Sequence, residues 1–178
     1  EATSNYEGAR LKVANFINCH EKEIIFTSGA TAAINLIAYS WGIKNLTPGD
    51  EIIITIAEHH ANIVPWQLVA QQKGAKIIAA VVDPDQNFDP QIIANLVTNK
   101  TKIIAFPHVS NVLGTNFPVK EICNIAKNCG VFEIIILFFE NFFLIFLYIS
   151  LLVITKILGL YFFICFFIKL KFLFADNK

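Results

Sequence analysis

The stretch EIIITIAEHHANIVPWQ, residues 51–67, places a strand, a polar connection and the start of a helix in immediate succession. Its first six residues, Glu51–Ile56, are mostly β-branched and apolar, as is typical of a strand buried in a sheet. Residues 63–73 then favour a helix, because Pro65 is tolerated in a first turn and Gly74 follows as a C-terminal cap. A strand that leads directly into a helix is the repeating unit of α/β sheets.

The same order recurs along the first 130 residues. We expect strands at 24–27, 51–56, 76–82 and 102–109, and helices at 6–18, 30–41, 63–73, 90–98 and 118–128. The first helix is expected to be amphipathic, with Phe16 on its apolar face. Gly42 and Gly130 stand where two of the helices are expected to end. Alternating strands and helices predict an α/β fold, with a mostly parallel sheet covered on both faces.

The character of the sequence changes after Gly130. Residues 131–174 are rich in Ile, Leu and Phe, and their few charged residues are Glu133, Glu140, Lys156, Lys169 and Lys171. We therefore divide the chain into a segment of ordinary α/β composition, residues 1–130, and a hydrophobic tail, residues 131–178, which we expect to be helical.

Charge and cysteine usage exclude some classes of function. The 14 basic residues are balanced by 14 acidic ones, so no nucleic-acid partner is indicated. The four cysteines lack the paired spacing of a zinc or redox site, and no metal site is predicted. Because the chain begins at Glu1 and contains no Met, we expect its start to lie upstream, and no targeting signal can be read from it.

Three polar segments follow expected strands: Thr27–Thr31, Ala57–Asn62 and His108–Gly114. In parallel sheets, ligands bind beyond the carboxyl ends of the strands. The first segment, TSGAT, offers backbone N–H groups and hydroxyls to a phosphate, although the same pattern also serves as plain helix capping. His59 or His60 can stack on a flat ring or exchange protons, or can be a surface feature. Asn111 offers an amide at the same edge, or is a turn residue.

Taken in order, these segments resemble the cysteine desulfurases of the class V aminotransferase family, especially the branch that mobilises sulfur for iron–sulfur clusters. The resemblance covers roughly residues 6–130 and rests on the stretches FTSGAT (26–31), NLIAYSW (35–41), PGDE (48–51), EHHANIVPWQ (58–67) and HVSNVLG (108–114). The stretch at 58–67 is the most specific of these to that branch.

The resemblance implies a three-layer large domain of the PLP-dependent aminotransferase type, a homodimer and the cofactor pyridoxal 5′-phosphate (PLP). It implies that L-cysteine is converted to L-alanine and an enzyme persulfide, whose sulfur goes to an acceptor protein in the bacterial cytoplasm or in plastids. By motif, Ala30 and Thr31 would bind the cofactor phosphate, and His59 would stack on the pyridine ring and assist proton transfer. Asn111 would lie near the phenolic oxygen of the ring and the substrate carboxylate.

The family pattern breaks off after Gly130. The resemblance calls there for an Asp that pairs with the pyridine nitrogen, a Schiff-base Lys, a persulfide-forming Cys and substrate-binding Arg residues, and none is found. Lys156 and Cys165 have none of the expected context. We therefore assign no catalytic residue and expect the chain as written to be an inactive, truncated domain. A selenocysteine lyase or another class V member is the alternative enzyme, and a non-catalytic, membrane-attached binding fragment is the alternative of another class.

Three origins of the tail stay open. The first is translation of AT-rich DNA through an intron or frameshift, because Phe, Ile, Leu, Lys, Asn and Tyr all have AT-rich codons. The second is a membrane anchor, since residues 134–154 and 157–174 are each close to the roughly 20 residues that span a bilayer. The third is an extension of the buried core, which so many adjacent Phe residues disfavour.

Overall fold

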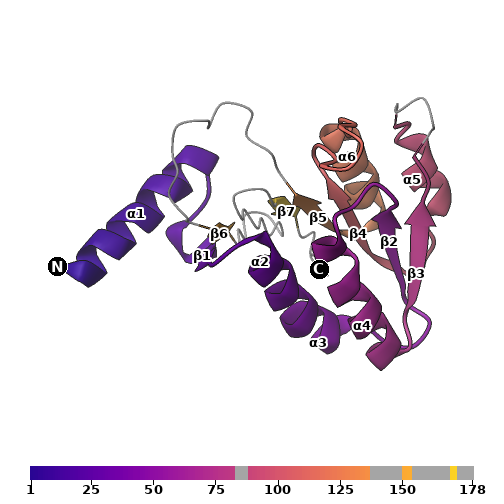
Figure 1. Ribbon diagram of the computed structural model, residues 1–178, viewed down its shortest axis with the longest axis horizontal. Coiled ribbons are helices and arrows are strands. Elements are labelled where there is room, and N and C mark those ends of the chain that lie inside the picture. Colours follow the sequence, from indigo (N-terminus) through magenta and orange to yellow (C-terminus); the bar gives the residue numbers. More distant parts are fainter. Residues whose placement is uncertain (83–87, 137–149, 154–168, 172–178) are drawn as a thin grey trace, which may run out of the picture.

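The computed structural model describes residues 1–82, 88–136, 150–153 and 169–171. Its centre is a five-stranded sheet in the order β3-β2-β4-β5-β7 (Figure 1). The strands are β2 (Glu51–Thr55), β3 (Lys76–Ala80), β4 (Thr101–Pro107), β5 (Phe132–Ile136) and β7 (Lys169–Lys171). The first four are parallel and β7 pairs antiparallel with β5. The predicted α/β class with a mostly parallel sheet is confirmed.

Helices cover both faces of the sheet, which gives three layers (Figure 1). One face packs against α2 (Ala30–Ile37), η2 (Ala38–Gly42), α3 (Ile43–Asn45) and α4 (Val64–Lys73), and the other against α5 (Gln91–Leu96) and α6 (Val119–Cys129). Alternate residues of one strand serve the two faces: Ile52 and Ile54 lie in the first core and Ile53 in the second. Unbroken runs of isoleucine suit strands that are buried on both sides.

The helix expected to end at Gly42 continues to Asn45, so that expectation is wrong. Residues 38–42 form a π-type turn, and the chain stays helical through Ile43–Asn45. Gly42 is buried, and a Cβ there would lie 3.1 Å from Val69 Cγ1 and 3.3 Å from Trp66 Cζ3. Glycine is therefore needed at this position for the close approach of α4 rather than to stop the helix.

The glycines expected to follow two other helices do so. Gly74 and Gly130 adopt left-handed conformations, with φ of 69° and 66°, directly after α4 and α6. The polar turn expected at 83–87 lies outside the described residues.

The N-terminal arm consists of α1 (Ala2–Ile17), η1 (Glu21–Glu23) and β1 (Ile24–Thr27). It lies to one side of the main sheet, and β1 pairs antiparallel with β6 (Ser150–Val153) in a separate two-stranded sheet (Figure 1). The helix and the strand were both predicted, but β1 does not join the parallel sheet. Phe16, expected on an apolar face of α1, is 72% exposed.

Only part of the hydrophobic tail is described. Residues 132–136 form β5, and β6 and β7 are strands too, so the described part of the tail contains no support for the expected helix. The rest of the tail lies outside the described residues. Among the residues that the structure describes, no helix is both long and apolar enough to cross a bilayer.

Candidate functional site

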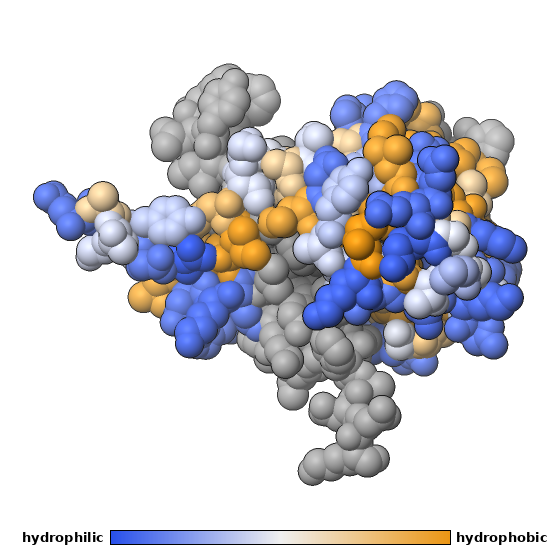
Figure 2. Space-filling model, turned by 90° about the horizontal axis from the view of Figure 1, so that it is seen from below, coloured by the Kyte–Doolittle hydropathy of each residue, from blue (hydrophilic) through white to orange (hydrophobic). Residues whose placement is uncertain are grey.

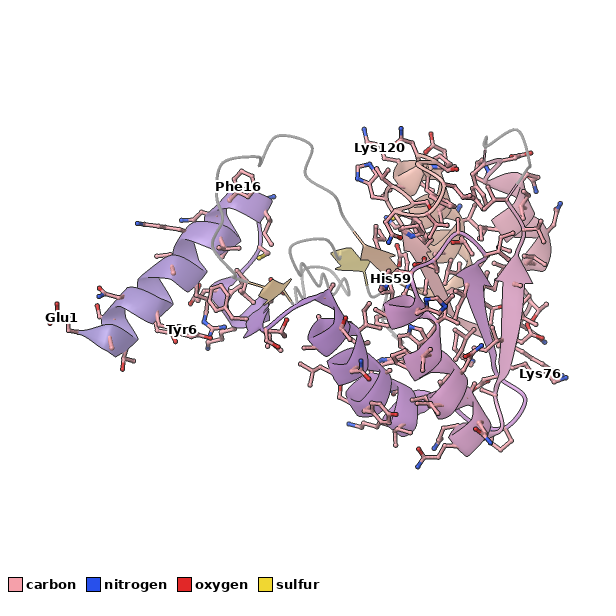
Figure 3. All side chains as sticks on the ribbon, in the orientation of Figure 1. Glu1, Tyr6, Phe16, His59, Lys76 and Lys120 are labelled. Carbon is pink, nitrogen blue, oxygen red and sulfur yellow. The ribbon has the colours of Figure 1, made fainter. Side chains whose placement is uncertain are left out.

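The three polar segments singled out in the sequence lie near one another in the fold. Two of them follow β2 and β4, which are adjacent parallel strands, so both begin at the same edge of the sheet. The remaining segment, Thr27–Thr31, leads into α2. This helix packs against η3 (His60–Asn62), the short turn after β2. Figure 3 shows His59 in the connection above α4, away from Lys76 at the start of β3.

Ala30 and Thr31 are the first two residues of α2. The first N–H groups of a helix have no carbonyl partner within it, and they carry partial positive charge. Gly29 is the N-cap residue, and no side chain of the described part of the chain caps this helix end. Thr27 Oγ1 donates instead to the carbonyl of Gly29, at 3.1 Å. The first turn of α2 is thus suited to accept an anion.

His59 is an exposed residue in extended conformation, and it caps η3. Its Nδ1 accepts a hydrogen bond from the backbone N–H of Ala61, at 3.1 Å. Since Nδ1 is the acceptor, a neutral imidazole carries its proton on Nε2. The ring lies edge-on to that of His60, with centroids 6.2 Å apart. The bond to Ala61 fixes the direction in which the imidazole can meet a ligand.

Asn111 is exposed in the loop between β4 and α6. The loop is closed by a hydrogen bond from the N–H of Gly114 to the carbonyl of Ser110 and by one from the N–H of Ser110 to the carbonyl of Thr115, both 2.9 Å long. Gly114 has φ of 73°, a left-handed conformation that glycine adopts without strain. The Asn111 side chain is therefore presented from a tight, well-defined loop.

Ser110 connects this loop to the segment that carries His59. Its hydroxyl donates to the carbonyl of Ala57, at 2.8 Å, and accepts the N–H groups of Val112 and Leu113, at 3.2 and 3.1 Å. The bond to Ala57 joins residues 53 positions apart. The structure thus brings the segments of His59 and Asn111 together through a direct contact.

A buried carboxyl lies next to His59. Glu58 is 5% exposed, and burial raises its pKa from 4.5 to about 8. The Asn62 side chain, the His59 backbone and the Thr55 side chain lower the pKa in part, but within the described part of the chain no group meets hydrogen-bond geometry with either carboxyl oxygen. Burial is therefore the dominant influence on the pKa of this carboxyl, and it favours the neutral form.

Asn62 fixes the turn that follows His59. It is fully buried, and its Oδ1 accepts a hydrogen bond from Trp66 Nε1 at 3.0 Å. Trp66 is itself fully buried in the core between α4 and the sheet. The position of η3, and with it that of His59, therefore depends on the packing of α4.

The described residues offer no cluster of metal ligands, and the thiol of Cys19 lies in the N-terminal arm rather than at this edge. Among the described residues, no three His, Cys, Asp or Glu side chains gather as metal ligands would. Burial, aided by the charge of Glu23, raises the pKa of Cys19 to about 12, which disfavours the nucleophilic thiolate.

The sequence did not reveal the roles of Ser110, Glu58 and Asn62. All three belong to the polar segments that follow apolar strands, and this is the one signal that they share. Their burial and long-range hydrogen bonds follow from tertiary contacts that residue spacing does not encode.

The edge combines a helix N-terminus, an oriented imidazole and an exposed amide. A phosphate suits the first, a flat aromatic ring the second, and a phenolic or carboxylate oxygen the third. These donors fit the three parts of PLP named by the resemblance. The roles of Ala30, Thr31, His59 and Asn111 stay predictions.

Comparison with known proteins points to one family. Residues 1–135 match the model of the family described as aminotransferase class V. A probable cysteine desulfurase of Synechocystis sp. is 48% identical over 130 residues, which are 72% of this chain and 31% of that protein. A probable cysteine desulfurase of Halalkalibacterium halodurans is 49% identical over 135 residues, 75% of this chain and 33% of that protein. The chain spans about a third of the length of these relatives.

Solved structures that resemble this chain include cysteine desulfurases as well. The cysteine desulfurase CsdA of Escherichia coli superimposes with a TM-score of 0.70 at 38% identity, over 75% of this chain and 34% of that one. The cysteine desulfurase of Thermococcus onnurineus gives a TM-score of 0.69 at 30% identity, over 75% of this chain and 39% of that one.

Proposed function

This chain belongs to the class V aminotransferase family, and we propose that it carries the phosphate- and ring-binding part of a PLP-dependent cysteine desulfurase. The observation that supports this most is the meeting of the three predicted segments at one edge. The hydroxyl of Ser110 ties the loop of Asn111 to the connection after β2, and α2 packs against η3. The names of the relatives favour L-cysteine over selenocysteine as the substrate.

Each part of the edge has one role in the proposal. The first turn of α2 binds the phosphate, through its backbone N–H groups and the hydroxyl of Thr31. His59 stacks on the pyridine ring, and Asn111 donates its amide to an oxygen of the ring or substrate. When bound, PLP supplies an electron sink for substrate cleavage.

His59 is suited to hold a proton at Nε2. Because Nδ1 accepts the N–H of Ala61, the neutral ring carries its proton on Nε2, and this atom can act as a donor toward a ligand. Nε2 is therefore the atom through which His59 would pass a proton to a bound ligand.

The chain as written is proposed to bind PLP reversibly and without a covalent bond. The family's Schiff-base Lys and persulfide-forming Cys have no counterpart in the matched segments, and the chain spans about a third of its relatives. Homodimer formation and transfer of sulfur to an acceptor protein are further parts of the proposal, and they belong to the whole enzyme.

A titration with PLP tests this function. We expect saturable binding, measured by cofactor absorbance and by quenching of Trp fluorescence, and at least a tenfold weaker affinity in His59→Ala. His20→Ala is the matched control, because His20 caps η1 through the same kind of bond, Nδ1 accepting the N–H of Lys22 at 3.1 Å, but lies in the arm. The control should bind PLP as the unmodified chain does.

Two results would overturn the proposal. One is the lack of saturable binding by the unmodified chain. The other is an equal effect of the His59 and His20 substitutions. In the same samples, release of alanine from L-cysteine is expected to stay at the level of free PLP, because the chain lacks the residues that complete the reaction.

A further inference from the structure

The hydroxyl of Ser110 lies where the loop of Asn111 contacts the segment of His59. Ser110 is 2% exposed and directly precedes Asn111 in the loop between β4 and α6. A serine hydroxyl has one donor and two acceptor positions. All three are used here: the donor reaches the carbonyl of Ala57, and the acceptors take the N–H groups of Val112 and Leu113.

The backbone of Ser110 is equally engaged. Its N–H donates to the carbonyl of Thr115, and its carbonyl accepts the N–H of Gly114. Four of these five bonds close the loop on itself. The fifth, from the hydroxyl to Ala57, leaves the loop and reaches the neighbouring connection, two residues before His59.

We infer that Ser110 is a positioning residue of the proposed PLP site, whose hydroxyl sets the loop carrying Asn111 against the segment carrying His59. This inference rests on the proposed function. The bond to Ala57 is buried, so water does not compete with it, and its loss would leave a buried carbonyl without a partner. A methyl group in place of the hydroxymethyl side chain would release the loop from the segment at a small loss of volume.

Three substitutions at this position separate hydrogen bonding from packing. Ser110→Ala removes the hydroxyl, Ser110→Cys replaces it with a weakly bonding thiol, and Ser110→Thr keeps it but adds a methyl group to a buried site. Ser40→Ala is the matched control. The hydroxyl of Ser40 also donates to a backbone carbonyl, that of Leu36, but this bond is exposed and lies within one helical stretch.

The first measurement is amide hydrogen exchange in the absence of PLP. In S110A the amides of Val112 and Leu113 should exchange at least tenfold faster, while those in the centre of α4 stay unchanged. S110T should keep the protection of both loop amides, and S40A should leave them as in the unmodified chain. Unchanged exchange in S110A would overturn the inference whatever the outcome with PLP.

The second measurement is the dissociation constant for PLP, compared with the free energy of unfolding of each variant. We expect a rise of about tenfold in S110A, a smaller rise in S110C and less than threefold in S110T. A purely structural role predicts that affinity follows stability. S110T, destabilised by its extra methyl, would then bind poorly, and that result overturns the inference.

The two proposals fail in different ways. If the unmodified chain does not bind PLP, the proposed function is wrong, while the exchange data still report on the link made by Ser110. If the unmodified chain binds PLP and S110A binds it as well as S40A does, the inference is wrong and the function stands. If S110A fails to fold, the affinities of the other two variants for PLP decide. Tighter binding by S110T than by S110C supports the inference, and equal or weaker binding by S110T overturns it.

Discussion

The N-terminal arm and the sheet region, residues 30–136, are stabilised in different ways. The sheet region has two extensive apolar cores, one on each face, with fully buried residues such as Trp66 and Phe106. The core of the arm contains just two buried hydrophobic residues among those described, Ala14 and Ile24. Figure 2, which views the molecule from below, shows hydrophobic patches among hydrophilic ones over both regions.

Polar contacts around Arg10 support the arm instead. Arg10 donates to the carbonyl of Ile24 and forms an ion pair with Glu7, at 3.0 Å. Its guanidinium lies over the rings of Tyr6 and Phe26, 5.0 and 5.5 Å from their centroids. The comparison indicates that burial determines the sheet region, whereas a few directional contacts place the arm.

The largest expected effect is the difference in stability between two variants, each with one aromatic side chain truncated, one in the sheet region and one in the arm. Trp66→Ala should lower the free energy of unfolding by about 3–5 kcal/mol, because it leaves a cavity and removes the bond to Asn62. Phe16→Ala in the arm should change it by no more than about 0.5 kcal/mol, since Phe16 is mostly exposed. Urea denaturation followed by circular dichroism measures both. Equal losses would contradict the proposed difference between the regions.

The second effect depends on pH and concerns the sheet region. The pKa of Glu58 is about 8 in the folded chain against 4.5 when unperturbed, so between these values folding takes up a proton. The proton on Glu58 therefore contributes to the free energy of unfolding. This contribution is complete below pH 4.5 and falls by about 1.4 kcal/mol per pH unit up to pH 8. Glu58→Gln removes this slope and should be the more stable chain at pH 8.

The test of this effect is urea denaturation at pH 4.5, 6 and 8. Glu121→Gln is the control, because Glu121 is exposed on α6 and its substitution should leave the pH slope as it is in the unmodified chain. A Glu58→Gln chain whose stability stays below that of the unmodified chain at pH 8 would show that the carboxyl is paired and charged.

The smallest effect sharpens the picture of the arm. Arg10→Lys keeps the charge but loses the planar guanidinium that contacts two rings and the carbonyl of Ile24. We expect a local loss of about 1 kcal/mol, seen as faster hydrogen exchange of amides in α1 and β1, with exchange in β2 and β4 unchanged. Faster exchange throughout the sheet would mean that the arm and the sheet region unfold as one unit.

Most of the sheet region could be predicted from the sequence. Runs of β-branched residues mark β2, β3 and β4, and glycines mark the ends of α4 and α6, because these are local preferences of the backbone. The prediction failed at Gly42, where the reason for glycine is a helix more than 20 residues away. It also failed for β1, since nothing local specifies which sheet a strand joins.

The candidate site could be predicted in its parts but not in its connections. The rule that ligands gather at the carboxyl ends of parallel strands placed the segments of His59 and Asn111 at one edge, and the structure agrees. The bond from Ser110 to Ala57 and the burial of Glu58 join positions that only the fold brings together. Sequence patterns report the residue types and not such distances.

The close contact of Gly42 with Val69 and Trp66 has a consequence for how the site tolerates change. Gly42 continues the helical stretch that begins with the turn proposed to bind phosphate, and Trp66 holds the turn beside His59 through Asn62. The spacing between the two turns thus depends on how closely Gly42 packs against Val69 and Trp66, at a contact that includes none of the four residues proposed to bind the cofactor. It should be indifferent to ionic strength but sensitive to a single added methyl group, so a neutral, distant substitution can alter ligand fit.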